Sequence, residues 1–227
     1  MLIAVPSLLS PGRLAEIRGL IDGAEWCDGQ ATAGHQSALA KHNRQLPEDS
    51  DEARRAGEIV LDALAASPLF VAAALPLKVY PPLFSLYGPG ESFGAHVDGA
   101  IRVRRGSDFR LRSDLSATVF LEGPGGYDGG DLIIEDHFGA QKVKLEAGDM
   151  ALYPASSLHR VEPVTRGVRS VAVFWVQSMV RDDGARSLLL DLDRAIQAIA
   201  ADRGQDDCEI VRLTGVYHNL LRRWAET

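Results

Sequence analysis

Residues 148–170 read GDMALYPASSLHRVEPVTRGVRS, and their pattern decides the fold class. Short runs rich in Val, Leu and aromatic residues alternate with turn-forming segments that contain Gly, Pro, Ser or Thr. Runs of this length and composition, separated by such turns, are typical of β-strands. The stretch therefore predicts consecutive short strands.

The same chemistry extends over residues 77–178. Gly, Pro and Asp again separate the apolar runs, which include VYPPLFSLY, SATVFLEG, DLIIED, AQKVKLEAG and VRSVAVFWVQS. About seven or eight short strands at this spacing favour a barrel or sandwich over alternating strand–helix units.

Helical patterns flank this region on both sides. Residues 1–76 are expected to be mainly helical, because Ser10 before Pro11 is a helix start and Ser50 before two acidic residues is another. Residues 182–227 predict two further helices, which are expected to pack on the outside of the barrel. Their predicted apolar stripes are Leu188, Leu192, Ile196 and Ile199, and Ile210, Leu213, Tyr217, Leu220, Leu221 and Trp224. A homodimer formed through these helices is the alternative.

Composition limits the function classes. The chain has 227 residues, of which 46% are hydrophobic, and a net charge of −7, so it is expected to be a soluble globular protein without a nucleic-acid or anionic membrane surface as its main partner. Cys27 and Cys208 lack metal-binding spacing and predict plain thiols in a reducing compartment. The sequence shows neither a signal-peptide pattern nor an apolar run of membrane-spanning length, so the expected location is the cytoplasm.

One local cluster of positive charge follows residue 100. It consists of Arg102, Arg104, Arg105, Arg110 and Arg112. The cluster is either a solvated loop or a loop that meets an anionic substrate, and as a lid candidate it spans residues 99–114.

His96 and Asp98 stand two apart after a glycine-rich turn over residues 88–94. In an extended segment, alternate residues share a face, so both side chains are expected to point the same way. His159, at the start of a predicted strand, is the candidate third ligand. Two histidines and one carboxylate form the facial triad of non-haem iron(II) enzymes, although these donors also suit manganese, cobalt or zinc.

Arg169 lies ten residues after His159, across a predicted turn at 163–167. We expect this turn to form an antiparallel hairpin that places the two residues on neighbouring strands. An arginine there could clamp a carboxylate with two parallel hydrogen bonds. 2-Oxoglutarate has the required shape, with a chelating end for a metal and a free carboxylate at the other end.

These motifs resemble those of the Fe(II)/2-oxoglutarate dioxygenases, and within them the bacterial PKHD-type hydroxylases, which are related to prolyl 4-hydroxylases and sometimes described as iron-uptake factors. The resemblance runs nearly end to end and includes EWCDGQATAG, YGPGESFGAHVDGAI, RSDLSATVFLEGPGGYDGGDL and GDMALYPASSLHRVEPVTRGVR. It implies an α+β fold with a double-stranded β-helix (jelly-roll, cupin-like) core. The dioxygenase domain would cover residues 1–178, and a helical extension residues 179–227.

The resemblance also assigns roles. His96, Asp98 and His159 would bind Fe(2+), and Arg169 would bind the distal carboxylate of 2-oxoglutarate. Tyr87 falls where related prolyl hydroxylases place a tyrosine that contacts the co-substrate; the alternative is a packed strand tyrosine. Phe93 stands where they place a second tyrosine. L-Ascorbate and dioxygen are the other small molecules implied.

The activity that the resemblance implies is hydroxylation coupled to oxidative decarboxylation of 2-oxoglutarate to succinate. The substrate stays open between a protein or peptide side chain and a small molecule, with a link to iron uptake. A cupin-like metal-binding sensor or iron-responsive regulator without turnover is the alternative. A zinc hydrolase is disfavoured because no H-E-x-x-H motif occurs.

Overall fold

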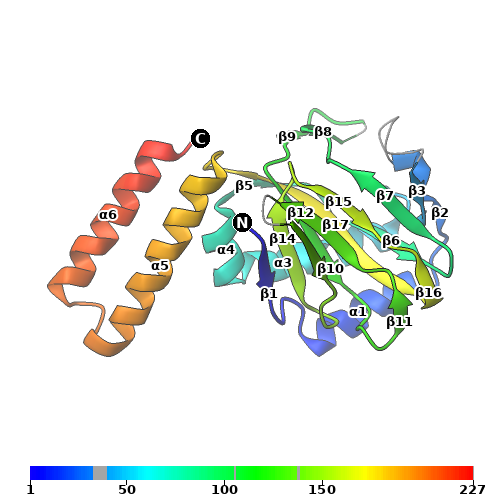
Figure 1. The fold of residues 1–227 in the computed structure, drawn as a ribbon, viewed down its shortest axis with the longest axis horizontal. Coiled ribbons are helices and arrows are strands. Elements are labelled where there is room, and N and C mark those ends of the chain that lie inside the picture. The colour runs from blue at the N-terminus through cyan, green and yellow to red at the C-terminus, as the bar shows by residue number, and fades with distance from the viewer. Residues whose placement is uncertain (33–39, 105, 137–138, 227) are drawn as a thin grey trace.

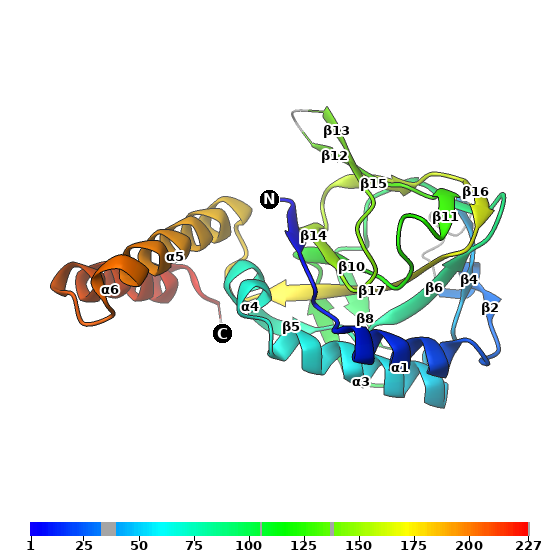
Figure 2. The same ribbon diagram turned by 90° about the horizontal axis from the view of Figure 1, so that it is seen from below.

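Two antiparallel sheets face each other, with helices covering the outer side of the larger one (Figures 1 and 2). This arrangement comes from a computed structural model that describes residues 1–32, 40–104, 106–136 and 139–226. The architecture confirms the expected α+β fold with a jelly-roll core.

The larger sheet runs in the order β1-β14-β10-β17-β6-β4-β2, with β5 also paired to β17. Its strands are β1 (Ile3–Val5), β14 (Met150–Pro154), β10 (Leu115–Phe120), β17 (Arg169–Ser178), β6 (Leu83–Tyr87), β4 (Arg44–Gln45), β2 (Cys27–Asp28) and β5 (Pro76–Val79).

The smaller sheet has the order β13-β12-β15-β7-β3. Its strands are β13 (Gly139–Val143), β12 (Leu132–Asp136), β15 (Leu158–Val161), β7 (Ser92–His96) and β3 (Lys41–His42). Two ribbons lie beside the sheets: β11 (Tyr127–Gly129) with β16 (Val164–Gly167), and β8 (Ile101–Val103) with β9 (Arg110–Arg112).

The N-terminal helices begin where the sequence predicts. Helix α1 (Pro11–Ile21) has Ser10 as its N-cap, and α3 (Asp51–Ala65) has Ser50, each side chain accepting a backbone N–H three residues on. Pro68 ends the α3 pattern but also opens the short helix α4 (Pro68–Ala74), because proline is favoured in a first helical turn. A 3-10 turn, η1, spans Gly29–Thr32.

The expectation that residues 1–76 are mainly helical is wrong in part. This region also supplies β1 to the larger sheet next to β14, β4 and the edge strand β2 to the opposite end of that sheet, and the edge strand β3 to the smaller sheet. These strands are two or three residues long. Such short segments carry no detectable period of their own, and their pairing depends on strands that lie far away in the sequence.

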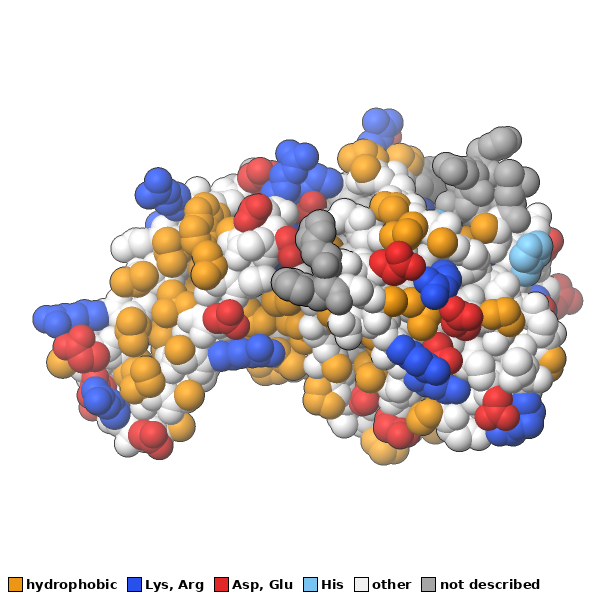
Figure 3. Space-filling view, in the orientation of Figure 1, with side chains coloured by type: hydrophobic (Ala, Val, Ile, Leu, Met, Phe, Trp, Pro, Cys, Tyr) orange, Lys and Arg blue, Asp and Glu red, His pale blue; other side chains and the backbone are white. Residues whose placement is uncertain are grey.

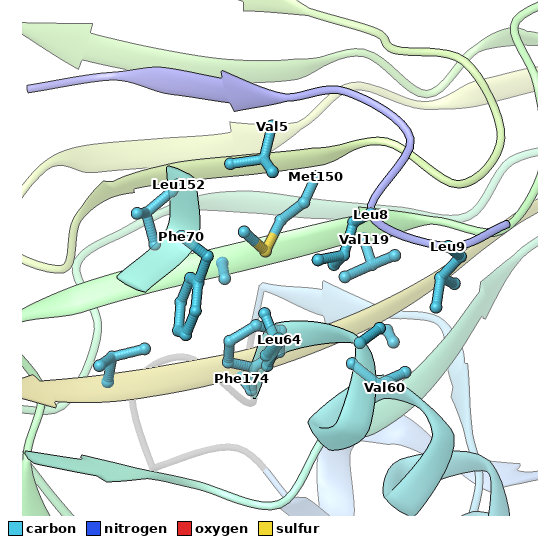
Figure 4. Packing of buried hydrophobic residues seen from close by; sticks show 14 of the residues in the cluster. Val5, Leu8, Leu9, Val60, Leu64, Phe70, Val119, Met150, Leu152 and Phe174 are labelled. Atoms are coloured by element: carbon cyan, nitrogen blue, oxygen red, sulfur yellow. The ribbon is translucent and has the colours of Figure 1, made fainter. Parts of the chain in front are cut away.

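Alternate residues of strand β10 face two different sides of the larger sheet. Leu115, Ala117 and Val119 face the helices and join the main hydrophobic core, while Ser116 and Thr118 face the smaller sheet. Figure 4 shows part of this core, where side chains from β1, β10, β14 and β17 meet those of α3 and α4. The helices therefore hold the larger sheet from outside and leave its inner face for a site.

Phe174 tests this core. It is 1% exposed on β17 and packs against the helices. Phe174→Ala is expected to lower the free energy of unfolding by about 3–5 kcal/mol, through lost burial and a residual cavity. Urea denaturation measures the change, with Val168→Ala at an exposed position as the control. A loss below about 1 kcal/mol, as at a surface site, would contradict the assignment.

The predicted hairpin that joins His159 to Arg169 is wrong. β15 pairs with β12 and β7 in the smaller sheet, whereas β17 pairs with β10, β6 and β5 in the larger one. The chain between them forms β16, which pairs with β11. The turn therefore carries the chain from one sheet to the other, so the two residues belong to opposing sheets.

The C-terminal helices α5 (Asp183–Arg203) and α6 (Cys208–Trp224) project as a pair beside α4 (Figures 1 and 2). The expected packing on the outside of the barrel is met only in part, because α5 packs on α4 and places Leu190 in the main core, while α6 packs on α5. The predicted first stripe is right for Ile196, which is buried, and for Leu192, which is partly buried. It is wrong for Leu188, which is 60% exposed, and for Ile199, which is also exposed; Leu189 and Leu190 are buried instead. Apolar side chains lie on the visible face of this pair (Figure 3). The homodimer stays a prediction.

Within the described residues, no single helix is long and apolar enough to cross a membrane. Helices α3 and α4 reach that length and composition only together, and they are bent by 83° at their break.

Candidate active site

Three potential metal ligands converge between the sheets. His96 ends β7, Asp98 follows it, and His159 lies on β15 directly opposite His96 in the strand register. One donor atom from each of the three lies within 4.8 Å of the others, and His159 Nε2 is 3.8 Å from Asp98 Oδ2. The cross-strand pairing thus brings together residues that are far apart in the sequence.

Both histidines are oriented by the backbone. The Nδ1 atom of His96 lies 2.8 Å from the carbonyl oxygen of Gly94, and that of His159 lies 3.0 Å from the carbonyl oxygen of Ser157. A proton on each Nδ1 can be donated to these carbonyls, which leaves the Nε2 lone pair for a metal. Histidines that bind a metal usually donate the N–H of their other ring nitrogen in this way. Burial, together with the neighbouring His159, lowers the pKa of His96, so this ring is neutral at neutral pH.

Further contacts hold the other side chains. The Ser116 hydroxyl on β10 donates to Asp98 Oδ2. The ring of Phe93 stacks on His96, with centroids 3.7 Å apart and planes at 18°. Phe93 therefore helps to orient His96 through an apolar contact. Two imidazoles and one carboxylate, each fixed in this way, fit a divalent metal such as iron(II).

Arg169 lies on the opposing sheet, paired in register with Tyr87 of β6. It is 1% exposed, and its Cζ lies 5.1 Å from the ring centroid of Tyr87 and 5.6 Å from that of Phe120. Among the described residues, Arg169 Nε has no hydrogen-bond partner. A buried guanidinium donor without a partner is costly, and a bound carboxylate would satisfy it.

One cavity of about 420 Å³ connects Arg169 with the three candidate ligands. Its lining also includes Tyr87, Ser85, Thr118, Tyr153, Leu132 and Val161. The three candidate metal ligands and Arg169 lie on opposite sides of the cavity. The space between them therefore suits a molecule with a chelating group at one end and a carboxylate at the other. The residues thus fit 2-oxoglutarate.

Gly130 leaves room for the arginine stem. Its φ is +62°, and a Cβ there would lie 2.8 Å from Val164 Cγ2 and 3.1 Å from Arg169 Cδ. Gly130→Ala is expected to displace the guanidinium and weaken 2-oxoglutarate binding by about tenfold to a hundredfold, measured by calorimetry. Gly106→Ala is the matched control, because its φ is +71° and a Cβ there meets nothing within 4 Å. Equal affinities in both variants would contradict this role.

The site also contains residues that sequence reasoning missed. Tyr153 on β14 is 3% exposed, with its ring 5.2 Å from that of His159, and burial together with the Asp98 charge raises its pKa. The signal was the strand alternation, since Met150 and Leu152 join the helix-side core while Tyr153 faces inward. Lys41 and Trp175 line the same cavity, and nothing local marked them. Arg102 lines it too, and the sequence marked this residue only as a member of the arginine cluster.

Comparisons with known proteins agree with this geometry. Residues 82–177 match the 2OG-Fe(II) oxygenase superfamily, and residues 183–226 match the PKHD-type hydroxylase C-terminal domain. The fold and the site thus define a 2OG-Fe(II) oxygenase. Relatives named PKHD-type hydroxylase from Rhizorhabdus wittichii and Methylobacillus flagellatus are 70% and 61% identical, each over 100% of both chains. The chain belongs to the PKHD-type hydroxylases, and this family membership implies dependence on iron(II) and 2-oxoglutarate.

Solved structures support the fold. A prolyl hydroxylase from Trichoplax adhaerens, in complex with a hypoxia inducible factor peptide, aligns with a TM-score of 0.58 at 13% identity, covering 82% of this chain and 86% of that one. HygX from Streptomyces hygroscopicus, with nickel, 2-oxoglutarate and hygromycin B bound, aligns with a TM-score of 0.55 at 14% identity, covering 78% and 82%. At these identities the likeness concerns the fold alone.

Proposed function

We propose that this protein hydroxylates a substrate while it couples the oxidative decarboxylation of 2-oxoglutarate to succinate. The observation that carries the proposal is one cavity that holds His96, Asp98 and His159 on one side and the buried Arg169 on the other. Family membership supports an oxygenase; the hydroxylation outcome and the residue roles are our inference.

In this proposal, His96, Asp98 and His159 would hold the metal. A set of two histidines and one carboxylate would leave the metal free to take co-substrate and dioxygen as well. Iron(II), when bound, supplies the one-electron and oxygen chemistry that side chains lack. Ser116 and the two backbone carbonyls hold the ligands in place, so little reorganisation is needed on metal binding.

Arg169 binds the distal carboxylate of 2-oxoglutarate in the proposal. Its planar guanidinium offers parallel N–H donors that match a carboxylate. The Tyr87 hydroxyl provides a further contact, since Tyr87 lies beside Arg169 in the register and lines the cavity. Tyr153 and Val161 close the walls of the cavity, which limits water around the reacting groups.

A metal sensor without turnover is the competing function, because it would need the same three metal ligands. Such a sensor has no need for a buried arginine that faces the metal across a cavity. The burial of Arg169 in that position therefore favours an enzyme.

The test measures succinate formed from 2-oxoglutarate by the purified protein with iron(II), ascorbate and oxygen. Many oxygenases turn over their co-substrate slowly without substrate, so low but metal-dependent succinate formation is expected. Asp98→Ala is the matched control and should form none. Metal binding without any succinate, with or without candidate substrates, would favour the sensor.

A further inference from the structure

Two cations besides Arg169 line the cavity. Lys41 comes from β3 at the edge of the smaller sheet, and Arg102 comes from β8. Asp98, the candidate metal ligand, is the single acidic residue among the described residues of the lining. The cavity is therefore rich in positive charge beyond what the co-substrate uses.

Arg102 lines the cavity and contacts two aromatic rings. Its Cζ lies 3.5 Å from the ring centroid of Trp175 and 5.6 Å from that of Tyr80. Trp175 lies on the same face of β17 as Arg169, six residues further along the strand. Arg102, which contacts Trp175, and Arg169 therefore lie near different ends of this strand face. Stacking on aromatic rings fixes the guanidinium plane while its N–H edge stays available for an anion.

Arg112 in the same arginine-rich segment has a different role. Arg112 Nε lies 2.6 Å from Asp114 Oδ1, and Arg112 Nη1 lies 2.8 Å from Glu226 Oε2. Arg110 is exposed on β9 and does not line the cavity. The cluster therefore divides, and Arg102 is its described member that faces the metal site.

Lys41 is buried near the metal ligands. It is 7% exposed, its Nζ donates to Gln45 Oε1 at 2.7 Å, and it lies 5.6 Å from the ring centroid of Phe93, which stacks on His96. Burial and the Arg102 charge lower the pKa of Lys41 to about 8. Burial also lowers the pKa of Arg102. Two desolvated cations that repel each other gain from an anion bound between them.

Two carboxylates of the protein outside the cavity lining act on these cations: Asp28 acts on Lys41, and Glu48 acts on both Lys41 and Arg102. Glu48 Oε2 accepts a hydrogen bond from the Tyr80 hydroxyl at 3.0 Å. Glu48 therefore holds Tyr80, one of the two rings that contact Arg102, and does so from outside the cavity lining.

The charges of the loaded site also indicate that the cavity favours a further anion. An iron(II) ion and Arg169 are together offset by Asp98 and the two carboxylates of 2-oxoglutarate. The loaded centre is then formally neutral. Asp28 and Glu48 act on the two cations from outside the cavity, so within the described lining no further acidic side chain faces Lys41 and Arg102. We propose, on the basis of the function proposed above, that the substrate presents a carboxylate to Lys41 and Arg102. The cavity of about 420 Å³ must also hold 2-oxoglutarate, so the part of the substrate that enters is a small group.

The test compares acids with their neutral amides. Protein loaded with iron(II) and saturating 2-oxoglutarate under anaerobic conditions is titrated in a calorimeter, where no turnover occurs. The probes are benzoate against benzamide, and acetyl-Ala-Glu-Ala-amide against acetyl-Ala-Gln-Ala-amide. At least one acid is expected to bind tighter than its amide by about tenfold or more, as for a hydrogen-bonded charge pair. Preference for benzoate alone indicates a free acid, and preference for the glutamyl peptide alone indicates an acidic side chain.

Arg102→Gln and Lys41→Gln are each expected to remove this preference while 2-oxoglutarate affinity stays within about threefold of wild type. Arg110→Gln, on the same hairpin, is the matched control and should keep the preference. Equal affinities for acid and amide in the wild type, no binding of either acid, or an unchanged preference in both cavity variants would overturn the proposal. Failure of the protein to bind iron(II) and 2-oxoglutarate appears in the loading step, before any probe, and is a failure of the proposed function itself.

Discussion

His159→Ala is expected to abolish iron(II) binding at neutral pH. His159 is 5% exposed, its Nδ1 is tied to the Ser157 carbonyl, and its Nε2 faces Asp98. Loss of residues that merely orient a ligand weakens metal binding by roughly tenfold to a hundredfold, so loss of a ligand itself should exceed that range. Succinate formation is expected to fall with the metal.

Anaerobic equilibrium dialysis with iron(II), followed by metal analysis, measures this loss. His218→Ala is the matched control, because His218 is exposed on α6, far from the cavity in the fold. Circular dichroism should show an intact fold for both variants. Wild-type iron affinity in His159→Ala would remove this residue from the metal site and with it the proposed arrangement.

Arg169→Ala is expected to raise the dissociation constant for 2-oxoglutarate by roughly a hundredfold, about 3 kcal/mol for a charged, largely buried clamp. Metal binding should persist, because Arg169 is on the opposite sheet from the histidines. The ligand-free variant is expected to be as stable as the wild type or more so, since it lacks a buried charge whose Nε has no partner among the described residues. Thermal unfolding with and without 2-oxoglutarate separates the two effects.

Pyruvate provides the control for this variant. It keeps the chelating 2-oxo acid but lacks the distal carboxylate. Wild-type protein loaded with metal should therefore prefer 2-oxoglutarate strongly, and Arg169→Ala should bind the two acids almost equally. Retained preference for 2-oxoglutarate in Arg169→Ala would mean that another residue binds the distal carboxylate.

Much of the fold was predictable because its signals are local. Ser10 and Ser50 cap helices through contacts three residues away, and the apolar runs of β10, β12, β14 and β17 show their strand character without reference to partners. The two-residue strands β2, β3 and β4 were not predictable, because their structure depends on pairing with distant strands. Lys41 shows the same limit, since only the pairing of β3 with β7 brings it to the metal ligands.

The sequence by itself determined the strand-rich core and the residue types available for a site. These are His96 and Asp98, with their spacing, and the candidate residues His159 and Arg169. Residue identity and short-range periodicity are sufficient for such conclusions. The tertiary structure alone decided that His159 and Arg169 face each other from opposing sheets, where a hairpin had been expected. It also placed Arg102 on Trp175 beside the same cavity. These facts depend on strand pairing between distant segments, and the local sequence carries no record of that pairing.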